Sequence, residues 1–160
     1  MSRIGQEFVT KEGYKIKIIE YFGCDNCTIQ FENGRIEYKK QYTHIKRGVI
    51  RNKEHKSKLG VGFIGVGDFQ TTHKGVITKA YKCWSAILNR IYDEKTRWKY
   101  PTYKDVEVCE EWLNFQNFAK WYENNKVDGW QLDKDILIKG NKTYSPTTCC
   151  FVPSFINSLF

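Results

Sequence analysis

Two aspartates near the C-terminus have the spacing of a metal-binding pair. Asp133 and Asp135 are two residues apart in a segment that we interpret as a short strand pair around residues 133–138, and both side chains would then lie on one face. Carboxylate oxygens bind hard divalent ions such as Mg²⁺. Lys134 and Lys139 are neighbours of this pair, so a salt-bridged surface is the alternative interpretation.

The densest cluster of positive charge lies between residues 46 and 58. Such a segment is suited to contacts with phosphates, and each contact releases counterions and makes binding sensitive to salt. The alternative is a solvated loop that only carries charge. The candidate phosphate-binding residues are Lys46, Arg47, Arg51, Lys53, Lys56 and Lys58.

A second segment, between residues 95 and 103, mixes cations with aromatic side chains. Its rings could stack on exposed bases, or they could form the packed hinge between two helices. The residues concerned are Lys95, Arg97, Trp98, Lys99, Tyr100 and Tyr103.

The spacing of the cysteines and histidines does not match a complete metal site or a catalytic triad. Cys24 and Cys27 form a CxxC, which is half of a zinc site or a redox pair, and the chain has no second CxxC and no HxxxH. Cys109 with Cys149 or Cys150 would complete it only if the fold brought them together, so we do not expect structural zinc. The three histidines all precede residue 74 and there is no Gly-x-Ser-x-Gly elbow, which argues against a catalytic triad.

Glycines alternate with apolar residues between positions 59 and 68. The spacing Gly60-x-Gly62-x-x-Gly65 matches a dinucleotide-binding loop, but no βαβ pattern follows it. We favour a strand and turn whose glycines let the backbone pack closely where the two halves of the chain meet.

Composition indicates a folded, basic protein. The 160 residues are 41% hydrophobic and 16% aromatic, and the formal net charge is +8. A surplus of this sign points to a polyanionic partner, with DNA or RNA as the first candidate. No apolar run reaches the roughly 18 to 20 residues of a membrane span and no secretion signal is recognisable, so we expect no membrane partner, reduced cysteines and a cytoplasmic location.

The elements divide into two predicted domains near residue 65. Residues 1–65 carry a net charge of +6 and contain four short strand patterns, with turn signals at 12–13, 25–26 and 33–34. They predict a small antiparallel β barrel or meander, with an SH3-like module as the best guess. The whole chain is therefore predicted to be an α+β protein.

Residues 66–160 carry a net charge of only +2 and read as mainly helical. Ala80, Trp84, Ile87, Leu88 and Ile91 recur at helical spacing and leave the cations of that segment beside the apolar stripe. A second helix is predicted from about residue 112 to 125. Ser145-Pro146 and Pro153 look like helix-start signals.

The C-terminal residues resemble a known family. The turn motif Gly-Asn-Lys-x-Tyr-Ser-Pro at 140–146, within the string 132–153, is similar to the C-terminal motif of phage-borne HNH-type (homing) endonuclease-like proteins. Ala-Tyr-Lys-Cys-Trp at 80–84 and Val-Cys-Glu-Glu-Trp-x-x-Phe at 108–115 share this similarity. The resemblance covers roughly residues 60–160 and implies a ββα finger, in which two strands and a helix present a general base and a divalent ion to a phosphodiester.

Carried over residue by residue, the resemblance places Asp133 at or near the first metal-side position and makes Asn157 the candidate ligand on the final helix. Lys134 stands where the family has its base histidine, and Thr148 stands near the position of the central asparagine, with Asn141 on the turn. Lys139 and Lys142 would contact the phosphate backbone.

The resemblance and the charge together imply a phage-type nucleic-acid-binding protein on an HNH endonuclease-like scaffold. If it cleaves, Asp133, Asp135 and Asn157 would hold Mg²⁺ or a similar ion at the scissile phosphate. The alternative is a non-catalytic binder in the cytoplasm of a host cell. That binder would be either a regulatory DNA-binding protein or a phage counter-defence inhibitor of a host nucleoprotein complex such as a CRISPR effector.

Overall fold

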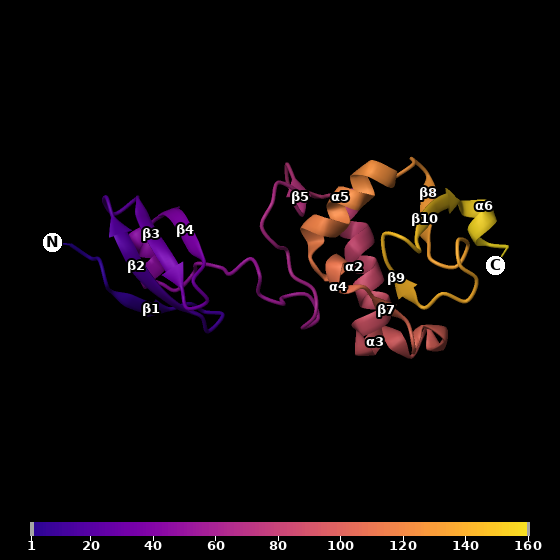
Figure 1. Ribbon diagram of the computed structural model, residues 1–160, viewed down its shortest axis with the longest axis horizontal. Helices are drawn as coiled ribbons and strands as arrows, with labels where there is room; N and C mark the ends of the chain where they lie inside the picture. Colours follow the sequence, from indigo (N-terminus) through magenta and orange to yellow (C-terminus); the bar gives the residue numbers. More distant parts are fainter. Residues whose placement is uncertain (1, 160) are drawn as a thin grey trace. The chain divides into compact units, whose positions relative to one another are not determined.

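The computed structural model describes residues 2–159 and divides the chain into two compact units, shown in Figure 1. The N-terminal unit is Met1–His55 and the C-terminal unit is Lys56–Phe160, so the division comes earlier in the chain than residue 65. With this boundary the N-terminal unit has eleven basic and seven acidic side chains, and the C-terminal unit has fifteen and eleven. Each unit therefore carries a net charge of +4, and the expected asymmetry of charge disappears.

The N-terminal unit is an open antiparallel meander with strand order β1-β2-β3-β4, followed by one short helix. Within residues 2–55, β1 pairs only with β2 and β4 only with β3, so the sheet does not close into a barrel. The mixed α+β class is confirmed. The elements are β1 (Glu7–Val9), β2 (Lys15–Tyr21), β3 (Cys27–Phe31), β4 (Ile36–Lys40) and α1 (Tyr42–Lys46).

Alternation along the strands builds the core of this unit. Ile16 and Ile18 of β2 face Ile29 and Phe31 of β3, and Ile45 of α1 covers them; all five side chains are buried. The β3–β4 connection turns at Gly34, whose φ of 88° suits glycine. This turn was expected from the Asn-Gly dipeptide.

The C-terminal unit contains most of the helices, with pairs of short strands around them (Figure 1). Its helices are α2 (Lys79–Tyr92), α3 (Glu94–Arg97), η1 (Pro101–Tyr103), α4 (Glu110–Leu113), α5 (Phe115–Asn125) and α6 (Ser154–Asn157). Its strands are β5 (Thr72–His73), β6 (Val76–Ile77), β7 (Glu107–Val108), β8 (Trp130–Asp133), β9 (Thr143–Tyr144) and β10 (Cys150–Pro153). β5 pairs with β6 and β8 with β10 in antiparallel fashion, and β7 pairs with β9 in parallel.

The helix α2 is the centre of this unit. It begins after Thr78, whose hydroxyl accepts a hydrogen bond from the backbone N–H of Tyr81. Its apolar stripe packs against α5, and the buried indole N–H of Trp84 donates to the carbonyl of Trp112 at 2.7 Å. The helical period therefore predicted α2 correctly.

The second predicted helix is interrupted. Asn114 has extended backbone angles and separates α4 from α5, and its side chain caps α5 by accepting from the N–H of Gln116. The helix breaks where the glycine-rich segment packs against it, because the backbone of Phe63 pairs there with the backbone of Leu113 and Phe115. The apolar period alone did not reveal this break.

The glycine-rich segment is a packing device of the C-terminal unit. A Cβ on Gly62 would lie 2.6 Å from Leu88 and 2.9 Å from Trp84, and one on Gly65 would lie 2.1 Å from Asn114. These contacts support the close-packing interpretation over a dinucleotide loop. They lie inside one unit, however, and not where two halves meet.

Residues 134–138 are not a strand. β8 ends at Asp133, and its partner is the distant strand β10, as the pairing of Asp133 with Cys150 shows. Ser145-Pro146 begins a turn and not a helix, whereas α6 does follow Pro153.

Among residues 2–159, no helix combines the length and the apolar character that crossing a bilayer requires.

Candidate functional site

A hollow of about 660 Å³ lies beside the end of β8. Four of its lining residues were predicted from the sequence as metal or phosphate ligands: Asp133, Asp135, Lys139 and Asn157. We call it the carboxylate hollow; its other lining residues are Tyr103, Ile136 and Gly140. The fold therefore brings the three proposed metal ligands to one concave surface.

Asp133 shapes the turn that forms one wall of the hollow. Its Oδ1 accepts hydrogen bonds from the backbone N–H groups of Asp135 and Ile136, both at 2.7 Å. Aspartate commonly binds its own backbone in this way at turns. The second oxygen, Oδ2, makes no hydrogen bond within residues 2–159.

Lys134 and Asn141 hold the two ends of this loop together. The Lys134 ammonium pairs with Asp135 Oδ2 at 2.6 Å and donates to the carbonyl of Asn141 at 3.2 Å. The Asn141 amide donates in turn to the carbonyls of Lys134 and Thr143, and its oxygen accepts from the N–H of Thr143. Both side chains thus fix the shape of the loop.

Thr148 has a similar bracing role further along the loop. Its hydroxyl donates to the carbonyl of Thr143 at 2.7 Å and shares a hydrogen bond of 2.7 Å with the Ser145 hydroxyl. Thr148 does not line the carboxylate hollow. Lys142, also predicted to contact phosphate, is exposed and lies 3.7 Å from Asp105.

Asn157 reaches the hollow from the last helix. α6 follows β10 directly and contacts both β8 and β10, so its single turn lies beside the strand pair (Figure 1). The Asn157 amide donates to Gln131 Oε1 at 3.0 Å, which leaves the amide oxygen available to a ligand.

The donor set of the hollow consists of hard oxygen atoms. Two carboxylates and one amide oxygen are the ligand types that Mg²⁺ takes from a protein when substrate phosphates and water complete its shell. Within residues 2–159 there is no cluster of three or more His, Cys, Asp or Glu side chains suited to a metal. The protein side chains that could bind an ion in the hollow are therefore limited to Asp133, Asp135 and Asn157.

The basic run 46–58 is split by the division of the chain. Lys46 and Arg47 at the end of α1, with Arg51 and Lys53, belong to the N-terminal unit, whereas Lys56 and Lys58 belong to the C-terminal unit. None of the six forms an ion pair within residues 2–159, and all except the half-buried Lys58 are exposed. Their charges are thus available to phosphates, but in two separate groups.

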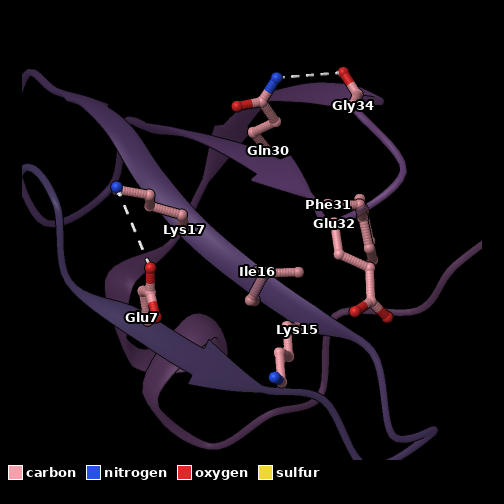
Figure 2. Close-up of a pocket in the computed structure, with 8 residues that line it drawn as sticks. All are labelled: Glu7, Lys15, Ile16, Lys17, Gln30, Phe31, Glu32 and Gly34. Atoms are coloured by element: carbon pink, nitrogen blue, oxygen red, sulfur yellow. Dashed lines mark hydrogen bonds and ion pairs between the residues drawn. The ribbon is translucent and has the colours of Figure 1, made fainter.

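A smaller hollow of about 300 Å³ lies on the sheet of the N-terminal unit. Figure 2 shows that Lys17 and Glu7 face each other on adjacent strands, and their charged atoms are 3.9 Å apart. Its lining also contains Lys15 and Glu32, so it has two positive and two negative side chains. Because these charges cancel, this hollow is not suited to a polyanion.

The cysteines are all free thiols within the described structure. Cys24 is exposed beside the Tyr21 hydroxyl at 3.3 Å, and the buried Cys27 donates to the carbonyl of Gly23. In the other unit, burial raises the pKa of Cys83 to about 12 and that of Cys149 to about 11. Such thiols are protonated at neutral pH and are poor nucleophiles.

A feature that sequence reasoning missed is the environment of Arg90. Its guanidinium lies over the rings of Tyr100 and Tyr103 and donates to the Tyr103 hydroxyl at 3.3 Å. Burial lowers the pKa of Arg90, but the interactions with Tyr103 and Tyr144 outweigh it and raise that pKa overall. The only sequence signal was that Arg90 flanks the apolar stripe of α2.

Comparison of this chain with protein-family models, with curated proteins and with solved structures finds no match.

Proposed function

We propose that this protein binds nucleic acid and holds a phosphodiester against a divalent ion in the carboxylate hollow. The observation that carries the proposal is that Asp133, Asp135 and Asn157 line one hollow with Lys139 beside them. An ion held there would neutralise phosphate oxygens and polarise a bound water. Lys139 would add a positive charge toward the same phosphate.

The order of elements around the hollow supports the resemblance to HNH-type endonuclease-like proteins. β8, β10 and α6 give two antiparallel strands followed by a helix, and the proposed ligands come from the first strand end and from the helix. We propose that this is a ββα finger with a helix of one turn. For the N-terminal unit, we propose that the open meander with α1 contacts phosphates through its exposed cations.

A specific observation favours a second candidate, a non-catalytic binder. Imidazole is the commonest general base, yet no histidine follows His73 in the sequence. Lys134 stands at the expected base position, but its ammonium group already pairs with Asp135 and donates to the Asn141 carbonyl. In this alternative the hollow holds a phosphate without cleaving it, as a regulatory protein or an inhibitor of a host nucleoprotein complex would.

Binding is tested by titrating the protein into a labelled mixed-sequence duplex across a salt series. The logarithm of the affinity should fall with the logarithm of salt concentration by about 0.9 for each phosphate neutralised. Replacing Lys53, Lys56 and Lys58 by Ala should reduce the slope, whereas Lys104→Ala, at an exposed position outside the basic run, changes it less. A flat salt dependence of the wild type would overturn the proposal.

Nicking of supercoiled plasmid with Mg²⁺ or Mn²⁺ separates the two candidates. Metal-dependent nicking that is lost in Asp133→Asn and Asn157→Ala would establish cleavage at the carboxylate hollow. Salt-sensitive binding without nicking in either metal would establish the non-catalytic binder. Nicking that survives in both variants would contradict the assignment of the hollow.

A further inference from the structure

We propose that a groove between α2 and the β8–β10 strand pair binds an unpaired segment of nucleic acid next to the carboxylate hollow. The inference rests on the proposed function and adds to it the form of the ligand and the surface that receives it. The groove has a volume of about 560 Å³ and lies wholly within the C-terminal unit. We call it the α2 groove.

One wall of the α2 groove is a row of cations along a single helix face. Lys79, Lys82 and Arg90 are at positions i, i+3 and i+11 of α2 and all line the groove, with the small exposed Ala86 between them. The two lysines are exposed; Lys79 has a weak partner, Asp128, at 3.9 Å, and both of these side chains are almost fully solvated. An exposed pair at this distance leaves most of the charge available.

The opposite wall offers an aromatic ring and amides. Trp130 at the start of β8 lines the groove and is 44% exposed, so part of its ring is open to a ligand. Gln131 and Asn157 are hydrogen bonded to each other on the same wall. No carboxylate lines the groove within residues 2–159, so the charged residues of its lining are all cations.

A row of cations opposite an accessible indole is the arrangement that binds single strands. The cations follow the phosphates, and the ring stacks on bases, which requires that the bases be unpaired. A duplex keeps its bases stacked internally, so it would gain the phosphate contacts but not the stacking. The α2 groove therefore favours single-stranded over double-stranded nucleic acid.

Asn157 connects the two depressions, because it lines both the α2 groove and the carboxylate hollow. A strand bound along α2 would thus be directed toward the hollow, where Asp133 and Asp135 lie. Arg90 also links the two depressions, because it lines the groove and donates a hydrogen bond to Tyr103, which lines the hollow.

The test compares the affinity of the full chain for a labelled single strand of mixed sequence with its affinity for the matching duplex. Lys79→Ala/Lys82→Ala removes two exposed cations, and the salt slope for the single strand should fall by about 1.4 at about 0.7 per phosphate. The matched control is Lys104→Ala/Lys120→Ala, which removes equal charge from exposed positions outside the groove lining and should change the slope less.

Stacking is tested at Trp130. Trp130→Ala should weaken single-strand binding by about five-fold to 150-fold, the range expected for the loss of one stacked base. Trp130→Phe should restore much of the affinity, because a ring remains. Phe22→Ala, which removes a 69% exposed aromatic ring from the N-terminal unit, should have little effect.

The outcomes distinguish the groove from the proposed function. If the wild type binds nucleic acid but the groove variants match their controls, the α2 groove assignment is wrong while the proposed function stands. Equal loss of duplex and single-strand affinity in Trp130→Ala would also contradict it. If the wild type binds neither form, the proposed function fails and the groove assignment fails with it.

Discussion

Asp133 offers a pair of substitutions that separates turn formation from ion binding. Its Oδ1 accepts two backbone hydrogen bonds at 2.7 Å, whereas Oδ2 makes no hydrogen bond within residues 2–159. Asp133→Asn keeps a carbonyl oxygen in a side chain of the same shape and removes the negative charge. Asp133→Ala removes both the acceptor and the charge.

The expected effects on the C-terminal unit differ in size and in their dependence on Mg²⁺. Asp133→Ala leaves two backbone N–H groups of a half-buried turn without their acceptor, and we expect it to lower the free energy of unfolding by about 1–3 kcal/mol. Asp133→Asn should cost less than about 1 kcal/mol. At a Mg²⁺ concentration about ten times the dissociation constant, the wild type should gain about 1.4 kcal/mol, and Asp133→Asn should gain much less.

The assay is urea unfolding followed by tryptophan fluorescence, with and without MgCl₂ at constant ionic strength. All five tryptophans lie in the C-terminal unit, so the signal reports the unit that contains the hollow even if the other unit unfolds separately. Asp68→Asn is the matched control, because it removes an exposed carboxylate outside the hollow.

Two results would refute the reasoning. Equal Mg²⁺ stabilisation of the wild type and Asp133→Asn would show that the ion does not bind at this carboxylate. Equal destabilisation by the asparagine and alanine substitutions would show that the turn needs the charge of Asp133 and not only its Oδ1 acceptor.

Three further predictions concern the C-terminal unit. Gly62→Ala places a Cβ 2.6 Å from the buried Leu88 and should lower the free energy of unfolding by about 1–3 kcal/mol; combined with Leu88→Val it should cost less than the sum of the single changes in a double-mutant cycle. Gln116→Leu removes the side chain that bonds the backbone N–H and carbonyl of Phe69 and the carbonyl of Ile64, and urea unfolding should show a loss of at least about 2 kcal/mol. Burial raises the pKa of Cys83 to about 12 and of Cys149 to about 11 from an ordinary value of 9.0, so the unfolded thiols ionise first and stability should fall as pH rises above 9 toward 12. The fall should be smaller in Cys83→Ala/Cys149→Ala, and an unchanged pH profile would contradict this.

Local periodicity predicted the elements whose stability comes from one buried face. In the N-terminal unit, short strand patterns were expected, and Ile16, Ile18 and Ile29 are buried in the strands that form there. The helical stripe through Trp84 and Leu88 likewise predicted α2, and both side chains are buried there. In these segments the local pattern and the tertiary packing favour the same structure.

Contacts between residues distant in sequence determine the features that local periodicity did not predict. The apolar spacing from Trp112 to Tyr122 fits one helix, but pairing of Phe63 with the backbone around Asn114 interrupts it. The partner segment is about fifty residues away in sequence, and no local pattern encodes such a pairing. The two units divide at His55, inside the charged run 46–58, which looks continuous in sequence.

The carboxylate pair shows that two residues can share one hollow although the local structure expected for them does not form. Asp133 and Asp135 were expected on one face of a strand, and that strand does not form beyond residue 133. They nevertheless line one hollow, because Asp133 binds the backbone N–H of Asp135 and thereby closes the turn that places both carboxylates there. The i, i+2 spacing that would put two side chains on one face of a strand is also the spacing of this turn. The same carboxylate therefore builds the wall of the hollow with one oxygen and offers the other to a ligand, which is why an isosteric change at Asp133 is the most informative test of function.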